Sequence, residues 1–381
     1  MREAVYLLGG YRSHFGVRYG IFKSVRPEIL GGKVLSAVCR DFCMGEAPQL
    51  VICGNAVGPG GNIGRLTALE AGLPVSTAAL TVDLQCASGL TAIDLAASKI
   101  ASGSCELVIA GGTESASLAP HRIYHENDER SRARRAEFTA AQFIPGEWGD
   151  DAMLLGAERA AKAAGITREE ADAAVLMSHQ RAVAAREAGR LTSIVLPLFG
   201  SERDEALRPR MSERLLSRAP RVTDFPDGIL TAANACTMND GAAFVVLASE
   251  KWLKDHAVKA KAKILDTMLV GGDPWCPPLS ADLAVGKLLE KQRLCYEDVD
   301  AFEYNEAFAV ISAHFYKNHE NVKERLNGWG GALAYGHPYG ASGAEIMLHL
   351  MERLKAESGH LGVAAIPAGG GVGEAILIES I

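Results

Sequence analysis

The sequence predicts an α/β fold, and two observations support this prediction. Short apolar stretches of strand length alternate along the chain with longer stretches whose apolar residues recur at helical spacing. A unit of strand, helix and strand also occurs twice, once in each half of the chain, which indicates a duplicated α/β domain with equivalent turns facing a shared site. The alternative for the second observation is chance similarity in a chain that contains 40 glycines.

The predicted elements follow a similar order in the two halves. In the first half we predict strands at residues 1–8, 50–53, 77–84, 106–112 and 242–248, and helices at 27–39, 63–72 and 90–100. In the second half we predict strands at 262–270 and 363–368, and helices at 280–291, before 318 and after 336. Each copy of the repeat begins with Ala-Ser-Gly, at 87–89 and 341–343, and closes with Gly-Gly, at 111–112 and 369–370. Gly340 of the second copy stands where Cys86 stands in the first.

The composition is that of a globular protein with two or three domain-sized units. The chain has 381 residues, of which 48% are hydrophobic and 22% are charged. A net charge of -7 argues against nucleic acid as a partner. No apolar run is long enough to span a membrane. Eight scattered cysteines without a zinc or redox spacing indicate a reduced, cytoplasmic protein.

Residues 117–235 differ in composition, and we predict an irregular insertion that carries substrate contacts. This segment contains an arginine-rich stretch at 130–135, one helical run at 157–164 and repeated prolines. His121 and His125 have the spacing of half a metal site. Because no third ligand follows at a recognised spacing, we predict no metal.

Cys86 is the candidate nucleophile. It lies between the predicted strand at 77–84 and the predicted helix at 90–100. The free backbone N–H groups and the positive dipole end of a helix start favour thiolate over thiol, so we expect a lowered thiol pKa. The alternative is a packed, inert cysteine, which is the usual state of a single buried cysteine.

Asn305 and His337 complete the candidate site. Both lie at turns beside predicted strands, among small residues that leave room for a ligand. A cysteine nucleophile needs hydrogen-bond donors for the oxyanion of its tetrahedral intermediate, and a histidine to manage protons or polarise the carbonyl. Backbone N–H groups at 369–371 are further candidate donors. Considered alone, His337 is interpreted as a helix cap and Asn305 as a turn residue. Together with Cys86 they make three such residues on matching turns, which favours a catalytic site.

Five motifs at these turns closely resemble those of the thiolase family, and the resemblance covers the whole chain. They are residues 85–90, 111–115, 239–243, 305–308 and 336–343. The resemblance implies the layered αβαβα thiolase fold, with two βαβαβαββ halves, a loop domain inserted in the first half and at least a dimer. The corresponding boundaries are 1–118 with 237–261 for the first half, 119–236 for the loop domain and 262–381 for the second half.

The resemblance also implies roles for the site residues. Cys86 takes an acyl group from an acyl-CoA or a 3-ketoacyl-CoA. His337 and a water held by Asn305 form one oxyanion hole for a thioester oxygen. The backbone N–H groups of Cys86 and Gly369 form the other oxyanion hole.

Contacts to the substrate follow from the same resemblance. Met153 matches a methionine that lines the acyl pocket, and Cys236 replaces a serine in a stretch that touches pantetheine. Candidates for contacts to the CoA phosphates are Arg214, Arg218 and Arg221. The expected ligands are CoA thioesters as substrates, with no permanently bound cofactor and no metal.

Pro367 departs from the family pattern. Thiolases carry a second cysteine two residues before the first glycine of the C-terminal glycine run, and this cysteine activates the acetyl methyl or the CoA thiol. The matching position here is Pro367, which has no ionisable group. Acyl transfer to Cys86 survives this change, whereas the ordinary second half-reaction is in doubt.

The leading hypothesis is a cytoplasmic CoA-dependent acyltransferase of the thiolase type that forms a homodimer or homotetramer. One alternative is a ketosynthase-like condensing or acyl-transferring enzyme, because ketosynthases use Cys, His and Asn without a second cysteine. The other alternative is an inactive homologue that binds acyl-CoA or serves as a subunit of a complex. Pro367 favours this last reading, and the intact set of Cys86, Asn305 and His337 disfavours it.

Overall fold

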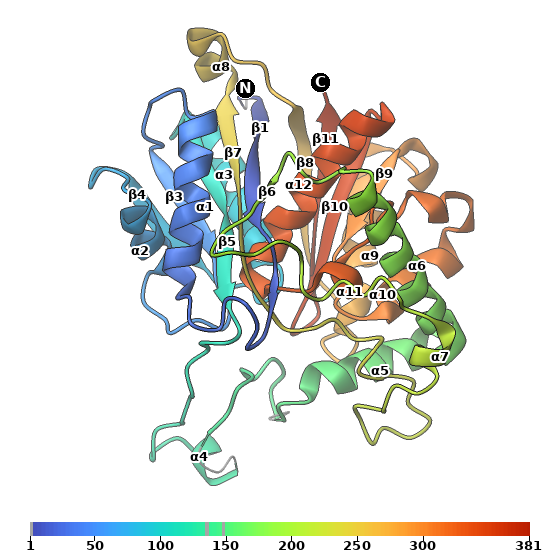
Figure 1. The fold of residues 1–381 in the computed structure, drawn as a ribbon. Helices are drawn as coiled ribbons and strands as arrows, with labels where there is room; N and C mark the ends of the chain where they lie inside the picture. The colour runs from blue at the N-terminus through green and yellow to red at the C-terminus, as the bar shows by residue number, and fades with distance from the viewer. Residues whose placement is uncertain (1–2, 134–136, 147–148) are drawn as a thin grey trace.

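The computed structural model describes residues 3–133, 137–146 and 149–381, which form the predicted α/β fold (Figure 1). In these residues one mixed sheet runs through the molecule in the order β4-β3-β5-β7-β1-β8-β11-β10-β9. The strands of this path are β1 (Val5–Ser13), β3 (Leu50–Gly54), β4 (Ala78–Val82), β5 (Leu107–Ser115), β7 (Asn239–Ser249), β8 (Ala262–Gly271), β9 (Ala301–Tyr304), β10 (Leu361–Ala368) and β11 (Val372–Ser380). Two short strands, β2 (Gly16–Val17) and β6 (Val195–Leu196), pair with β7 and β1.

The two halves of the sheet repeat one arrangement. The order β1-β7-β5-β3 in the first half is matched by β8-β11-β10-β9 in the second. In each half the first two pairings are antiparallel and the third is parallel. A short antiparallel pairing of β1 with β8 joins the halves. The duplication predicted from the Ala-Ser-Gly turns is thus confirmed by strand order and direction.

Helices cover the outer faces of the sheet and fill the space between its halves (Figure 1). The helices in and around the sheet are α1 (Pro27–Phe42), α2 (Ile63–Glu70), α3 (Ser88–Ala101), α8 (Glu250–His256), α9 (Ser280–Gln292), α10 (Ala309–Asn318), α11 (Ala332–Tyr335) and α12 (Tyr339–Glu357). Separate core clusters place α1 and α2 on the outer side of the first half, and α9 and α10 on the outer side of the second. A third cluster places α3 and α12 between the halves. This succession gives the αβαβα layers that the resemblance implied.

Glycine allows α3 and α12 to meet closely. A Cβ atom at Gly343 of α12 would lie 2.0 Å from the backbone nitrogen of Leu90 in α3. A Cβ atom at Gly89 would lie 2.6 Å from the carbonyl oxygen of Gly340. Because these contacts leave no room for a side chain, glycine lets the two helix starts approach backbone to backbone. The turns that precede the two helices are thereby brought together.

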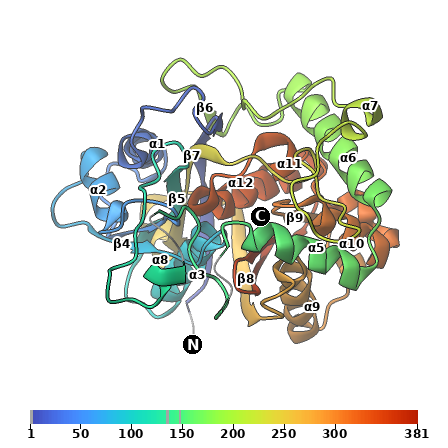
Figure 2. The same cartoon turned by 90° about the horizontal axis from the view of Figure 1, so that it is seen from below.

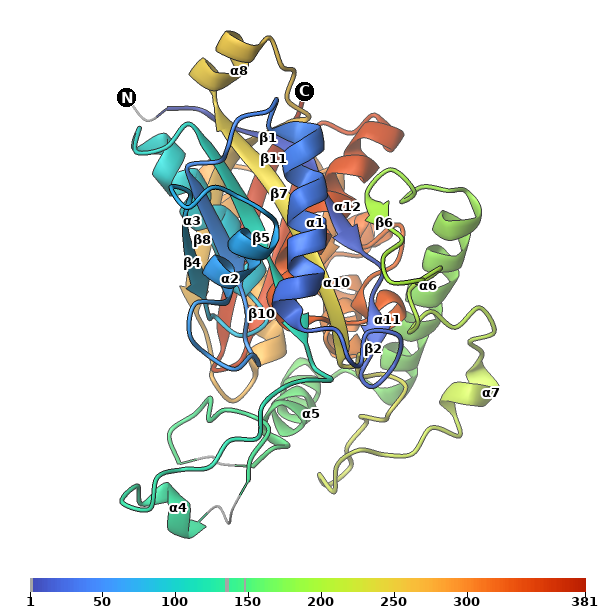
Figure 3. The same ribbon diagram turned by 60° about the vertical axis from the view of Figure 1, so that its left-hand side comes forward.

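The inserted segment runs from the end of β5 to the start of β7; its first part, with α4 and α5, lies on the lower side of the molecule in Figures 1 and 3, and α6 lies along the right-hand side. Its helices are α4 (Arg130–Ala133), α5 (Ala152–Ala164), α6 (Arg168–Glu187) and α7 (Glu213–Leu216). In the view from below, α5 lies in front of the second half of the sheet (Figure 2). The insertion is therefore less irregular than predicted.

Helix α6 is the longest of the elements that the sequence pattern did not indicate, which also include β11 and α8. Its residue Thr167 forms a capping box with Glu170 at the helix start. Its buried residues are small or polar: Ala171, Ala174, Val175, Ser178, His179, Ala182 and Ala185. Because a helix is recognised by large apolar residues at its spacing, this face gives little signal. No described helix combines the length and apolar character needed to cross a bilayer.

Candidate active site

Cys86 lies in a tight turn between β4 and α3. The backbone of Gln85 is left-handed, with a φ of 53°. Asp83 Oδ1 accepts a hydrogen bond from the Gln85 N–H at 2.9 Å. The Ser88 hydroxyl accepts from the Leu84 N–H at 2.9 Å and donates to the Gln85 carbonyl at 2.6 Å. These bonds fix the turn and hold the partly buried Cys86 just before the helix.

The expected lowering of the Cys86 pKa is wrong. Burial raises the pKa of the Cys86 thiol to about 12, and its own backbone N–H opposes this effect only in part. The N–H groups of Ala87 and Ser88 already donate to the carbonyls of Leu84 and Gln85, at 3.1 and 3.2 Å. Because these donors have acceptors, the helix start gives a thiolate little support. The resting residue is a neutral thiol.

His337 and Asn305 lie side by side in the interior. Asn305 Nδ2 is 3.4 Å from His337 Nε2, and His337 Nδ1 forms a hydrogen bond of 2.7 Å with the Ser342 hydroxyl. The His337 N–H donates to Asn239 Oδ1 at 3.0 Å. Burial lowers the pKa of His337 to about 3, so its imidazole is neutral at physiological pH. Asn305 Oδ1 is buried without a hydrogen-bond partner in the described residues, so it is free to accept from a water or a ligand.

Residues 235–238 link the Asn305 turn to the His337 turn. The Cys236 N–H donates to the carbonyl of Ala307, two residues after Asn305, at 3.0 Å. Met238 forms a backbone bridge with His337. Cys236 therefore lies between the two turns that carry the polar candidates.

Three side chains with raised pKa values lie near Cys86: those of Cys236, Tyr339 and Glu114. Burial raises the pKa of the Cys236 thiol, and the charge of a Cys86 thiolate raises it further. Burial is the main cause that raises the pKa of Tyr339, and negative charge on Cys236 or Cys86 would add to this effect. Burial raises the pKa of Glu114 to about 7, although its carboxylate accepts from the Gly340 N–H at 3.1 Å. Sequence reasoning gave Glu114 no role, and the only available signal was its place in the 111–115 motif.

Gly369 opens the turn between β10 and β11. The next two glycines have φ values of 81° and 78°, which side chains rarely adopt. The ring of Phe143, from the inserted segment, packs so closely that a Cβ atom at Gly369 would lie 2.8 Å from it. Pro367 is buried in β10 opposite Gly373 of β11. The role of Gly369 as an oxyanion donor stays a prediction.

The predicted substrate contacts lie on the inserted segment. Met153 of α5 packs on the same core cluster as Cys236. Arg214 lies in α7 and Arg218 follows it, both exposed. Arg221 is also exposed and donates to the carbonyl of Phe225. Their contacts with CoA stay predictions.

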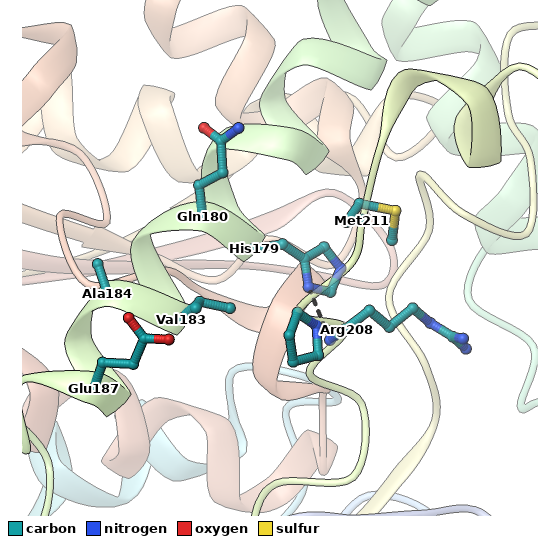
Figure 4. Close-up of a pocket in the computed structure, with 8 residues that line it drawn as sticks. His179, Gln180, Val183, Ala184, Glu187, Arg208 and Met211 are labelled. Atoms are coloured by element: carbon teal, nitrogen blue, oxygen red, sulfur yellow. Dashed lines mark hydrogen bonds between the residues drawn. The ribbon is translucent and has the colours of Figure 1, made fainter.

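Two surface cavities, of about 260 and 310 Å³, lie outside this site. The smaller lies between α6 and residues 208–211 (Figure 4), where His179 Nδ1 accepts from the Arg208 N–H at 3.3 Å. Burial, with the charge of Arg208, lowers the pKa of His179 to about 4. The larger is lined in part by Arg12 and Arg203. Among the described residues, no group of three or more His, Cys, Asp or Glu side chains is placed to hold a metal.

Comparison with known proteins finds similarity along the whole chain. Residues 5–251 match the family described as "Thiolase, N-terminal domain", and residues 258–380 match "Thiolase, C-terminal domain". A Bacillus subtilis relative named "Putative acetyl-CoA C-acetyltransferase YhfS" is 37% identical over 370 residues, 97% of each chain. The crystal structure of the Bacillus anthracis acetyl-CoA acetyltransferase aligns with a TM-score of 0.93 at 30% identity, covering 100% of this chain and 99% of the other. Human mitochondrial 3-ketoacyl-CoA thiolase in complex with CoA aligns with a TM-score of 0.90 at 30% identity, covering 100% and 98%.

Proposed function

Because this chain belongs to the thiolase family and is a CoA-dependent acyltransferase, we propose that Cys86 is the residue that accepts the acyl group. One observation carries the proposal. The glycine contact between α3 and α12 brings the turn of Cys86 to the turn of His337, beside Asn305. A thiol, an imidazole and an amide with a vacant acceptor together form an acyl-transfer site.

Acylation begins from a neutral site, so proton transfer accompanies the attack. Cys86 Sγ attacks the thioester carbonyl while its proton passes to the neutral imidazole of His337. The backbone N–H groups of Cys86 and Gly369 stabilise the oxyanion of the tetrahedral intermediate. The bond to the CoA sulfur then breaks, and the acyl group remains on Cys86.

The His337 and Asn305 pair acts on the second thioester. The protonated His337 and a water held by Asn305 Oδ1 donate to the carbonyl oxygen of the incoming acyl-CoA. The Ser342 hydroxyl at Nδ1 fixes the orientation of the ring. The pair of His337 and Asn305 thus polarises the thioester of the incoming acyl-CoA, which faces the acyl group on Cys86.

Incubation with a series of acyl-CoAs of increasing chain length tests this function. We expect one acyl group per chain by intact mass, with an equal amount of free CoA, and the fastest ester identifies the natural chain length. Cys86→Ala should form no adduct. Failure of every ester to form an adduct, or an adduct that persists in Cys86→Ala, would contradict the proposal.

A second candidate is acyl transfer from Cys86 to an acceptor other than a second acyl-CoA. It is favoured by Pro367, which the resemblance aligns with the family's second cysteine. A proline offers neither a proton nor a base, so transfer to a ready-made nucleophile requires less of this site than carbon–carbon bond formation. Release of CoA without formation of a 3-ketoacyl-CoA would favour this candidate.

We also propose that the chain forms a homodimer or homotetramer through the edge strand β4. Within the described residues β4 pairs only with β3, so its other edge is open. Three exposed apolar side chains precede β4 in the chain: Leu66 and Leu69 on α2, and Val75 in the loop between α2 and β4. Light scattering measures the oligomeric state.

We further propose a cytoplasmic location for the protein. Its eight free thiols are in keeping with this location.

A further inference from the structure

We propose that Cys236 is the acid–base residue of the second half-reaction, an inference that rests on the proposed function. It gives its proton to the departing CoA sulfur. The resulting thiolate then removes a proton from the carbon next to the thioester carbonyl of a second acyl-CoA. None of the catalytic roles proposed for Cys86, His337 and Asn305 supplies a base for this step.

The backbone fixes Cys236 beside the second thioester site. Its N–H donates to the carbonyl of Ala307 at 3.0 Å, in the turn that begins with Asn305. The His337 N–H points back at the Thr237 carbonyl at 3.3 Å. A carbonyl oxygen bound between His337 and Asn305 therefore has Cys236 as a neighbour, on the segment 235–238 that links their turns.

The other ionisable groups near Cys86 already have roles or partners. His337 receives the proton of Cys86. Glu114 accepts four hydrogen bonds, three of them from backbone N–H groups. Tyr339 is a phenol, which ionises less readily than a thiol. Cys236 is a partly buried free thiol, and the hydrogen-bond donor to its sulfur is its own backbone N–H, so its proton is available for exchange with a substrate.

Burial determines the acid–base character of the Cys236 thiol. Burial is the main cause that raises the pKa of the Cys236 thiol, and the charge on Cys86 adds to it. Because Cys86 is a neutral thiol at rest and a thioester after acylation, this second contribution is absent in both states and burial alone sets the shift. Burial that raises a thiol pKa also makes its thiolate a stronger base once formed.

The protons balance over the cycle. In acylation the Cys86 proton moves to His337, and the Cys236 proton moves to the CoA sulfur as the thioester bond breaks. The Cys236 thiolate then takes the proton from the second acyl-CoA, and the enolate attacks the acyl carbon on Cys86. The Cys86 sulfur leaves and regains the proton held by His337. The products are free CoA and a 3-ketoacyl-CoA, and all three residues return to their starting forms.

The test separates acylation from proton removal in Cys236→Ser, with Cys276→Ser as the matched control. Cys276 is another partly buried cysteine on the same core cluster. Acylation is followed by CoA release from acetyl-CoA. Proton removal is followed by exchange of the acetyl methyl protons of acetyl-CoA in heavy water. Cys236→Ala, and thermal unfolding of each variant, show whether the serine itself or a folding defect causes a change.

We expect Cys236→Ser and Cys236→Ala to slow exchange about 10²- to 10⁴-fold, the usual contribution of a positioned base. Acylation should slow less than about tenfold, because a thiol of ordinary pKa leaves with little help. Cys276→Ser should change neither rate. Exchange retained without Cys236, equal loss of both rates, or a wild type that acylates without exchange would overturn the inference. A wild type that does not acylate would instead overturn the proposed function.

Discussion

The two halves of the sheet place different chemistry on one repeated scaffold. The turn before α3 carries the thiol of Cys86, and the equivalent position in the second half is Gly340, in the first turn of α12. A Cβ atom at Gly340 would lie 2.6 Å from the carbonyl oxygen of Gly54, so this position has no room for a side chain. The second half instead contributes His337 and Asn305, from just before α12 and just after β9. Duplication thus supplies two turns that face each other, and the glycine at position 340 leaves space beside the turn that carries Cys86.

The central helices also differ in burial. In α12, 15 of 19 residues are buried, whereas in α3 the number is 8 of 14. Even charged residues of α12 lie inside, and Arg353 pairs with Glu303 at 3.0 Å. Helix α12 is therefore the more deeply buried of the two central helices. Changes on its packed face should therefore cost more stability than changes on outer helices.

The largest effect is expected from Gly343→Ala, compared with Gly286→Ala in the outer helix α9. Overpacking a core typically costs about 1–3 kcal/mol, and the Gly343 contact is with backbone, so we expect the upper end or complete loss of folding. At Gly286 the nearest atom to a Cβ would be 3.7 Å away, and the alanine should stabilise by about 0.4–1 kcal/mol. Urea unfolding measures both. Equal stabilities would refute the close contact of the two halves.

Loss of the polar groups of the second half should slow chemistry without loss of folding. Removal of one oxyanion donor costs about 10²- to 10³-fold in rate. We expect Asn305→Ala to slow formation of the 3-ketoacyl product by this factor, and His337→Ala to slow it by more, because it also removes the base that receives the Cys86 proton. Both variants should keep melting temperatures within a few degrees of the wild type. The exposed His360 and Asn318 provide control alanine variants with unchanged rates. A His337 or Asn305 variant that fails to fold would make that residue structural.

Glu374 tests the contact between the halves through pH. It lies on β11, and the Thr91 hydroxyl of α3 donates to its carboxyl at 2.6 Å. Burial raises the pKa of Glu374 to about 8, so the folded chain holds a proton that the unfolded chain releases above about 4.3. Stability from this group therefore falls as pH rises from about 4.3 to 8, by at most about 1.4 kcal/mol per pH unit. Glu374→Gln should lose this slope in unfolding experiments, and an unchanged slope would show that Glu374 is already ionised.

A neutral Cys86 predicts a specific pH profile for alkylation. Because its pKa is about 12, the rate of iodoacetamide labelling at Cys86 should rise about tenfold per pH unit between pH 7 and 10. Mass spectrometry of the Cys86 peptide measures this rate. A plateau near neutral pH would instead indicate a preformed thiolate paired with protonated His337.

The sequence indicated the scaffold because the repeated turns depend on glycine and alanine, whose positions are visible without a structure. It singled out Cys86, Asn305 and His337 as candidates for the same reason, since each stands beside such a turn; their catalytic roles stay predictions. It misjudged the pKa of Cys86, because burial by the surrounding fold raises this pKa and the N–H groups at the helix start already donate to carbonyls of the turn. It missed α6, whose buried face is made of small residues. Contacts of Arg214 or Met153 with substrate depend on a bound ligand, which neither pattern nor spacing specifies.

The most direct test of the account is to locate the acyl group after a brief reaction. The protein is mixed with acetyl-CoA, quenched in acid within seconds and digested, and the cysteine peptides are analysed by mass spectrometry. We expect one acetyl group on the peptide that contains Cys86, and unmodified peptides for the other seven cysteines. An acetyl group on Cys236 or another residue, with Cys86 unmodified, would contradict the assignment of the nucleophile to the first half.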